Sequence, residues 1–293
     1  MDTNSNQARR VVIGITAHVD AGKTTLAEAM LYRTGQLRKL GRVDHGSAAM
    51  DSHLLERERG ITIFSSQAEL PIGDLEVTLL DTPGHVDFSA EMERTLSVLD
   101  YAILVISGAD GVQAHTRTLW RLLELYRIPT FLFVTKMDFG RCGRGQMMEH
   151  LHHELGEGCV DFTPADRERR MEQLATCRED ALEAYLDGGE VPDALVRQLV
   201  GRRLVFPCWF GSGLKLEGID EFLEGLARYV EPPAYPAAFS ARVFKISHDP
   251  QGKRLTHLKV TGGTLRVRDA VPYAGHQEKA AQLQQKYEGR LEE

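Results

Sequence analysis

The sequence predicts an α/β protein with a mostly parallel sheet, followed by the beginning of a β-barrel. Apolar runs alternate with amphipathic stretches through most of the chain, which is typical of a sheet covered by helices. The run Val11–Ile15 leads through a short loop into the helix-like stretch 26–31. After a Pro-rich linker at 231–236, short strand-like runs take over.

The expected elements follow from the hydrophobic pattern. Strands are expected at 11–17, 61–70, 75–81, 101–107, 130–135 and 203–208, and helices at 23–35, 87–99, 112–127 and 217–229. Residues 36–60 are polar and charged, and they indicate a long functional loop. Residues 139–200 are rich in Glu and Arg and read as a helical insertion with few strand signals.

Two domains are expected, 1–233 (with the insertion 139–200) and 234–293. In the second, strands are expected at 239–246, 255–260 and 265–268, and the stretch 276–293 has helical propensity. The segment 234–293 is short for a closed barrel with its own core. We therefore expect it to form part of a barrel, and the chain to be a fragment.

The composition narrows the class of protein. The 293 residues are 42% hydrophobic and 26% charged, which is ordinary for a globular chain. The net charge of −7 argues against broad wrapping of nucleic acid, although a small RNA footprint stays open. The polar N-terminus, the four scattered cysteines and the lack of a long apolar run predict a cytoplasmic location without membrane contact.

The strongest motif is the phosphate loop, residues 17–25, which reads Ala-His-Val-Asp-Ala-Gly-Lys-Thr-Thr. A loop between a strand and a helix that ends in Gly-Lys-Thr wraps the phosphates of a nucleotide with backbone N–H groups. Lys23 is expected to reach the outer phosphates and Thr24 to ligate Mg²⁺. The expected backbone contacts come from Asp20, Ala21, Gly22 and Thr25. Ala17 stands where such loops usually have their first Gly.

Two further segments suit the metal and the last phosphate. Asp81 ends the strand 75–81, where its carboxylate can serve Mg²⁺, and Gly84 can approach a γ-phosphate. Asp-Thr-Pro-Gly is also a common turn sequence. Its position at the end of a strand, downstream of the phosphate loop, favours a metal and phosphate site over a plain turn. Thr62 closes the long loop and can bring its hydroxyl to Mg²⁺, although it also suits a plain strand start.

The candidate base-binding residues follow the last strands. Asp138 offers two oxygens to the N1–H and N2–H₂ donors of guanine, which adenine lacks, while the stem of Lys136 packs on the base. Ser212, Gly213 and Leu214 can present backbone N–H groups to the guanine O6, although Gly-Ser-Gly is also generic loop sequence. Ligands of open α/β sheets bind at the carboxyl ends of strands, which favours the functional interpretation.

These motifs, in this order, resemble translational GTPases of the elongation factor G family. The stretches 40–44, 54–63, 96–100 and 110–114 are most similar to the tetracycline-resistance ribosomal protection proteins. The resemblance implies a P-loop NTPase domain and part of a second domain, with GTP and GDP as substrate and product. It also implies Mg²⁺, a ribosome-stimulated GTPase that is slow alone, contact with ribosomal RNA, and a monomer.

The resemblance assigns further roles. His85 would orient the water that attacks the γ-phosphate, Val19 and Ile61 would form an apolar gate that holds His85 back, and Asp20 would hold a monovalent cation. The family usually has Asn where this chain has Thr135, so a weaker tie between the base-binding and phosphate loops is expected.

Other interpretations stay open at this point. One is a guanine-nucleotide switch module with little or no turnover, and another is a fragment of an elongation factor G-like translocase. An ATPase is disfavoured by Asp138. The cluster His150-Leu151-His152-His153 lies in a predicted polar helix and suits a surface pair between Glu149 and His153 better than a metal.

Overall fold

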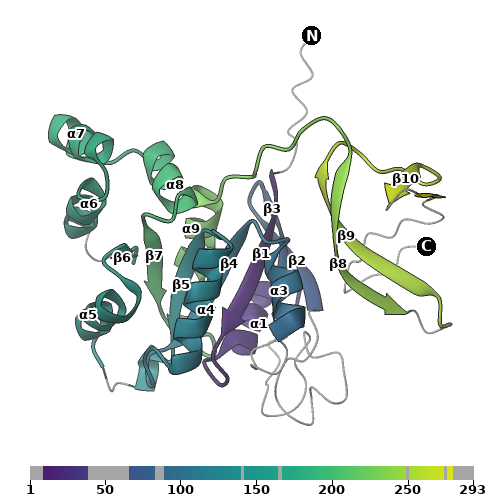
Figure 1. Cartoon of the computed structure of the whole chain (residues 1–293). Helices are drawn as coiled ribbons and strands as arrows, with labels where there is room; N and C mark the ends of the chain where they lie inside the picture. The colour runs from purple at the N-terminus through teal and green to yellow at the C-terminus, as the bar shows by residue number, and fades with distance from the viewer. Residues whose placement is uncertain are drawn as a thin grey trace. The chain divides into compact units, whose positions relative to one another are not determined.

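The structure is a computed structural model that describes residues 9–38, 66–82, 89–139, 142–163, 167–248, 251–273 and 276–279. The chain divides into two compact units, Met1–Pro232 and Pro233–Glu293 (Figure 1). In the ranges just given, no helix is both long and apolar enough to cross a membrane.

The first unit is built on a seven-stranded sheet in the order β2-β3-β1-β4-β5-β7-β6. Its strands are β1 (Arg9–Ala17), β2 (Ser66–Ile72), β3 (Leu75–Asp81), β4 (Tyr101–Ser107), β5 (Thr130–Thr135), β6 (Cys159–Asp161) and β7 (Phe206–Phe210). All neighbours pair in parallel except β2, which pairs antiparallel with β3. The predicted α/β class with a mostly parallel sheet is therefore confirmed.

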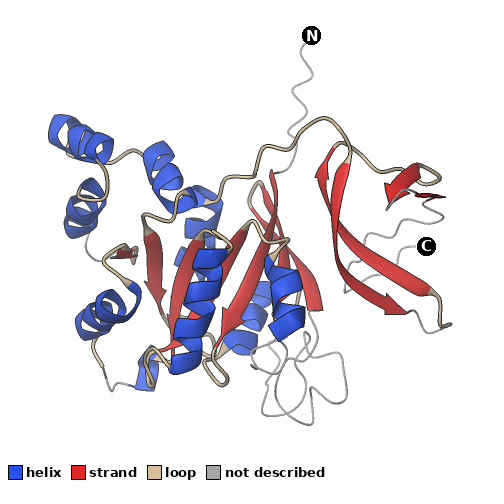
Figure 2. Cartoon of the chain, viewed as in Figure 1, coloured by secondary structure: helices blue, strands red, loops and turns tan. Residues whose placement is uncertain are grey.

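Helices cover both faces of this sheet (Figure 2). One face packs on α1 (Lys23–Arg33) and α9 (Ile219–Tyr229), and the other on α3 (Ser89–Leu96), α4 (Ala114–Leu125) and α5 (Arg144–Leu155). Strands β4 and β5 are buried along their whole length, as expected for the central strands of a parallel sheet. The two faces thus carry two hydrophobic clusters, and the loops at the strand ends are left to form a site.

The insertion differs from its prediction in one respect. Helices α5, α6 (Arg167–Ala175), α7 (Glu179–Gly188) and α8 (Asp193–Gly201) bear out its helical character. However, β6 lies between α5 and α6 and pairs in parallel with β7, so this segment extends the main sheet. Cys159 and Val160 are fully buried there, but three residues are too few to give a periodic strand signal in the sequence.

The last strand of the sheet begins later than predicted, at Phe206 rather than 203. Leu204 and Val205 donate backbone hydrogen bonds to Leu199 O, which ties them to the end of α8. Arg203 has a positive φ of 58°, and its guanidinium lies over the ring of Trp120 at 5.2 Å. This segment is a turn held by the helix, and it cannot join the ladder until Phe206.

The second unit contains two antiparallel strand pairs, β8 (Ser240–His248) with β9 (Arg254–Gly262), and β10 (Ala270–Tyr273) with β11 (His276–Lys279). The strand predicted at 265–268 is instead a turn, in which Asp269 N donates to Arg266 O at 3.1 Å. Residues 276–279, in the stretch with helical propensity, form β11 instead, because pairing with β10 overrides local propensity. The rest of that stretch lies outside the described residues.

Candidate functional site

The phosphate loop connects β1 to α1 and has the geometry that an anion site needs. Ala17 is fully buried, so a small residue fits where a glycine was expected. Ala21 N donates to His18 O at 3.1 Å, which closes a tight turn. Gly22 caps α1 with a φ of 92°, a left-handed conformation that glycine adopts without strain. The first turn of α1 contains no acidic residue, so the positive end of the helix dipole is not neutralised.

Lys23 and Asp81 form a buried ion pair beside this loop. The Lys23 Nζ contacts Asp81 Oδ1, and the two side chains are only 9% and 1% exposed. Thr82, the next residue after β3, donates its hydroxyl to Ile15 O of β1 at 2.8 Å. The ends of β1 and β3 are therefore tied together, which fixes an ammonium and a carboxylate at one place. The ammonium is a suitable ligand for phosphate, and the carboxylate supplies an oxygen ligand of the kind that Mg²⁺ prefers.

Thr135 connects the base loop, residues 135–138, to the phosphate loop. Its buried hydroxyl donates to Ala21 O at 2.5 Å and also lies 3.2 Å from Ile106 O. Lys136, in a left-handed conformation with φ of 57°, donates from Nζ to Asp20 O at 2.6 Å. Two side chains of the base loop thus hold the backbone of the phosphate loop. The tie expected to be weak at Thr135 is made by its hydroxyl.

Asp138 receives support from the Ser-Gly loop, residues 211–218, which follows β7. Lys215 Nζ lies 3.2 Å from Asp138 Oδ2. Partial burial opposes ionisation of this carboxyl, but hydrogen bonds from Lys215 and Ser212 outweigh it and lower its pKa. Backbone hydrogen bonds between Ser212 and Glu217 run in both directions and close the loop. Asp138 is therefore an ionised acceptor at neutral pH, held by a rigid neighbouring loop.

Some of the remaining predicted residues are described by the structure, and others lie outside the described ranges. Gly213 packs against the backbone of Thr25, since a Cβ on it would meet Thr25 O at 3.2 Å, whereas Leu214 is 54% exposed. Thr24 is half-buried in the first turn of α1, and Val19 is half-buried in the phosphate loop. The predicted residues Ile61, Thr62, Gly84 and His85 lie outside the described residues.

Sequence reasoning missed Lys215 and assigned His150 differently. Lys215 is visible in the sequence as a lysine just beyond the Ser-Gly-Leu stretch, but its pairing with Asp138 depends on the fold.

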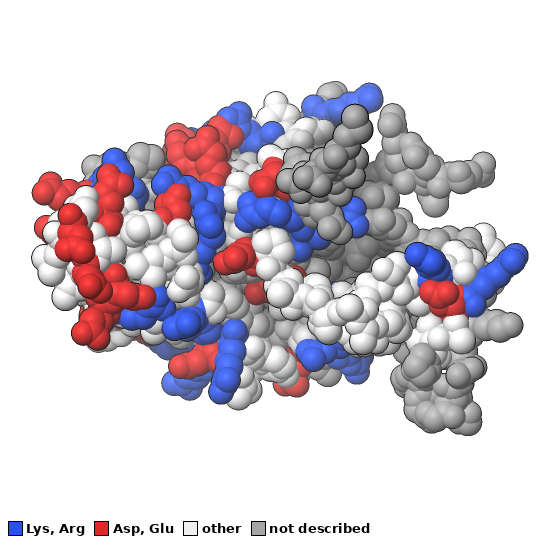
Figure 3. Space-filling model, turned by 90° about the horizontal axis from the view of Figure 1, so that it is seen from above, with Lys and Arg blue, Asp and Glu red and all other residues white. Residues whose placement is uncertain are grey.

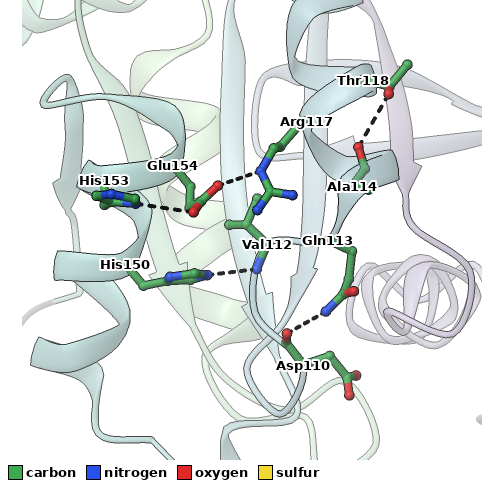
Figure 4. A network of polar contacts seen from close by, with 9 residues as sticks. All are labelled: Asp110, Val112, Gln113, Ala114, Arg117, Thr118, His150, His153 and Glu154. Atoms are coloured by element: carbon green, nitrogen blue, oxygen red, sulfur yellow. Dashed lines mark hydrogen bonds and ion pairs between the residues drawn. The ribbon is translucent and has the colours of Figure 1, made fainter.

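His150 Nε2 accepts a hydrogen bond from Val112 N at 3.1 Å (Figure 4). The same view shows Arg117 bound to Glu154 at 2.5 Å, and His153 pairing with Glu154 rather than Glu149. His150 and Glu154 thus tie α5 to Val112, just before α4, and to Arg117 of α4.

Replacing Thr135 with valine tests the tie between the loops. Valine keeps the shape but removes the donor, which leaves the buried Ala21 carbonyl without this hydrogen bond. We expect a loss of about 1–2 kcal/mol in the free energy of unfolding and guanine-nucleotide binding weakened about fivefold. Urea denaturation and titration with a fluorescent guanine nucleotide measure the two effects.

Thr130→Val is the matched control. Thr130 is equally buried, and its hydroxyl donates to Ile128 O at 2.9 Å, away from both loops. This variant should lose stability and keep its nucleotide affinity. Thr135→Asn supplies an amide and should tighten binding; unchanged affinity in both Thr135 variants would refute the role given to this residue.

Comparison with known proteins gives a consistent result. Residues 8–232 match the family described as the elongation factor Tu GTP binding domain. The chain is 39% identical over 288 residues to an oxytetracycline resistance protein of Streptomyces rimosus, and 34% identical over 276 residues to the tetracycline resistance protein TetO of Campylobacter jejuni. Each alignment covers 88% of this chain and 43% of the relative, so the chain spans less than half of their length.

A solved structure of a protein from Thermus thermophilus is also similar. It superposes with a TM-score of 0.82 and 27% sequence identity, and the match covers 93% of this chain and 48% of that one. The fold of this chain is therefore shared by a protein of about twice its length.

Proposed function

Because the chain belongs to the family of the elongation factor Tu GTP binding domain, we propose that it binds and hydrolyses GTP as part of a ribosome-acting translation factor. One observation carries the proposal. Lys23 of the phosphate loop forms the buried ion pair with Asp81, and the backbone of this loop also accepts hydrogen bonds from Thr135 and Lys136 of the base loop. Phosphate, metal and base ligands then belong to one site.

In this proposal, Lys23 and the backbone N–H groups at the start of α1 bind the phosphates, and Asp138 selects guanine. Mg²⁺ would be held by oxygen ligands from Thr24, Asp81 and Thr62, and it would neutralise charge that develops on the phosphates. The fit rests on the buried Asp81 carboxylate, which contacts Lys23, the residue that precedes the half-buried Thr24 in the sequence. Asp20 has a positive φ of 60°, and we propose it as the ligand of a monovalent cation.

Hydrolysis in the proposal depends on His85, which orients the attacking water when ribosomal RNA positions it. Val19 and Ile61 are the proposed gate that keeps His85 away until then. Phosphoryl transfer needs mainly positioning and charge neutralisation, so moving one imidazole changes the rate greatly. We therefore expect slow turnover by the chain alone.

GTP turnover with and without ribosomes tests the proposal. We expect nucleotide binding in both cases, slow release of phosphate alone, and stimulation by ribosomes that His85→Ala removes. Equal and fast rates under both conditions would overturn the gating. Tight GDP binding without any hydrolysis, even with ribosomes, would instead favour the switch module.

The similarity to resistance proteins supports one version of this function. Relatives that share 34–39% of the aligned residues are named for tetracycline or oxytetracycline resistance. We propose that this chain is the GTP-binding part of a monomeric, cytoplasmic protein of that class, acting at the factor-binding site of the ribosome. Restoration of translation in the presence of tetracycline by the protein that contains this chain would support it over a translocase.

A further inference from the structure

The loop that follows β4 is joined to the base loop. This β4 loop, residues 108–113, lies at the same edge of the sheet as the phosphate and base loops, because β1, β4 and β5 run parallel. Gly108 N donates to Thr135 O at 2.8 Å. The two loops are so close that a Cβ on Gly108 would come within 2.7 Å of Met137 Sδ. A shift of the β4 loop therefore moves the base loop.

The β4 loop also reaches the phosphate loop, through the start of α4. His115 in the first turn of α4 lies against His18 of the phosphate loop, with ring centroids 6.0 Å apart and ring planes tilted by 57°. Helix α4 begins directly after Gln113, whose side chain donates to Asp110 O at 2.6 Å. The start of α4 is thus fixed to the β4 loop, and the phosphate loop packs against it.

Helix α5 holds the β4 loop and α4 with two side chains one helical turn apart (Figure 4). His150 Nε2 accepts from Val112 N at 3.1 Å. Glu154 accepts from Arg117 of α4 at 2.5 Å. The imidazole lies directly over Gly111, where a Cβ would be 2.9 Å from Nε2 and where the φ of 70° also favours glycine. The β4 loop is therefore shaped to receive this ring.

The two contacts of α5 differ in what they determine. Figure 3 shows basic and acidic side chains side by side over much of the face seen there, so ion pairs are an ordinary feature of this surface. Arg117 is 43% exposed, and an ion pair with so exposed a partner contributes little. The His150 bond instead satisfies a backbone N–H of the buried Val112. The histidine contact therefore decides where the β4 loop lies.

We propose that His150 is a positioning residue of the nucleotide site, which slows the release of bound guanine nucleotide by fixing the β4 loop. The inference rests on the proposed nucleotide-binding function and adds to it a residue outside the site. His150 acts through the contact of Gly108 with the base loop and that of His115 with the phosphate loop.

Release of fluorescent GDP from the whole chain tests this role. His150→Leu removes the acceptor, and we expect GDP to dissociate about fivefold faster. Hydrolysis of bound GTP in a single turnover should change by less than about twofold, because no group that contacts the nucleotide is removed. The Glu154–Arg117 pair remains in this variant, so α5 should stay docked and the chain folded.

His150→Gln and His150→Asn are the decisive pair of variants. Oε1 of glutamine is as many bonds from Cα as Nε2 of histidine, so glutamine can still accept from Val112 N. Oδ1 of asparagine is one bond closer to Cα and stops short of the loop. We expect release at the parent rate in His150→Gln and fast release in His150→Asn, a difference that a side chain which only fills space would not produce.

Amide hydrogen exchange follows the same contacts without nucleotide. The N–H groups of Val112 and Gly108 should exchange faster in His150→Leu and His150→Asn, and at the parent rate in His150→Gln. His152→Leu is the matched control on the same helix, because His152 Nε2 contacts Cys159 O at 2.8 Å and not the β4 loop. This control should lose stability and keep the parent rate of GDP release.

The outcomes separate this inference from the function on which it rests. Equal GDP release in His150→Leu and the parent, or in the glutamine and asparagine variants, would contradict the role of His150 and leave the proposed GTPase intact. Equally fast release in His152→Leu would contradict it too, since loosening of α5 would then suffice. Failure of the parent chain to bind guanine nucleotide would instead overturn the proposed function, and this inference with it.

Discussion

Lys23→Met is expected to abolish GTP hydrolysis and to destabilise the fold. The methionine stem fills similar space, but it lacks the ammonium that contacts Asp81 and that we propose to contact the phosphates. Loss of a charged hydrogen bond to phosphate costs about 1.5–3 kcal/mol, and loss of charge stabilisation in the transition state lowers the rate about 100-fold or more. The Asp81 side chain is 1% exposed, so removing its buried ion-pair partner should cost about 3–5 kcal/mol of stability.

The two consequences are separated by a second variant. In Lys23→Met with Asp81→Asn, the buried carboxylate is replaced by a neutral amide of the same shape. This double variant should regain most of the thermal stability and should still fail to hydrolyse GTP. Thermal denaturation and phosphate release measure the two effects, and Lys253→Met, an exposed lysine of the second unit, is the control that should change neither. Wild-type turnover in Lys23→Met would refute the phosphate role.

The centre of the main sheet was predictable because its central strands are buried on both faces. Strands such as β4 and β5 read as continuous apolar runs, and a parallel sheet requires this pattern. The strand β6 was missed because three residues carry no period, and residues 203–205 were misassigned because their hydrogen bonds go to the end of α8. In both cases, contacts distant in sequence decided the local structure.

The candidate site was predictable to the level of its motifs, and less so in its connections. Lys23, Asp81 and Asp138 stand out because each follows or precedes a strand in a recognisable pattern. The hydrogen bond from Thr135 to Ala21 joins residues 114 positions apart, and the Lys215–Asp138 pair joins two separate loops. Such contacts depend on the strand order, which brings the ends of β1, β5 and β7 to one edge.

Asp138→Asn is expected to reverse the base preference of the site. In the proposed function, the carboxylate accepts from both the N1–H and the N2–H₂ of guanine, whereas an amide offers one acceptor and one donor. One hydrogen bond is then lost and two donors face each other, so the affinity for GTP should fall at least about 100-fold. Xanthine has a carbonyl in place of the 2-amino group, so it should accept the new amide donor. Competition titrations with GTP, XTP and ATP against a labelled nucleotide measure this change.

The controls distinguish base selection from loss of the surrounding ion pair. Asp138→Asn also breaks the contact with Lys215, so Lys215→Met provides the variant in which only that contact is lost. Because Lys215 is 52% exposed, its removal should change GTP affinity by less than about 1 kcal/mol and leave the base preference intact. Thr135 and Lys136 still hold the phosphate loop in Asp138→Asn, so XTP should be hydrolysed at a rate similar to that of GTP in the parent. If ATP competes as well as GTP in the parent chain, Asp138 does not select the base and the site is not guanine-specific.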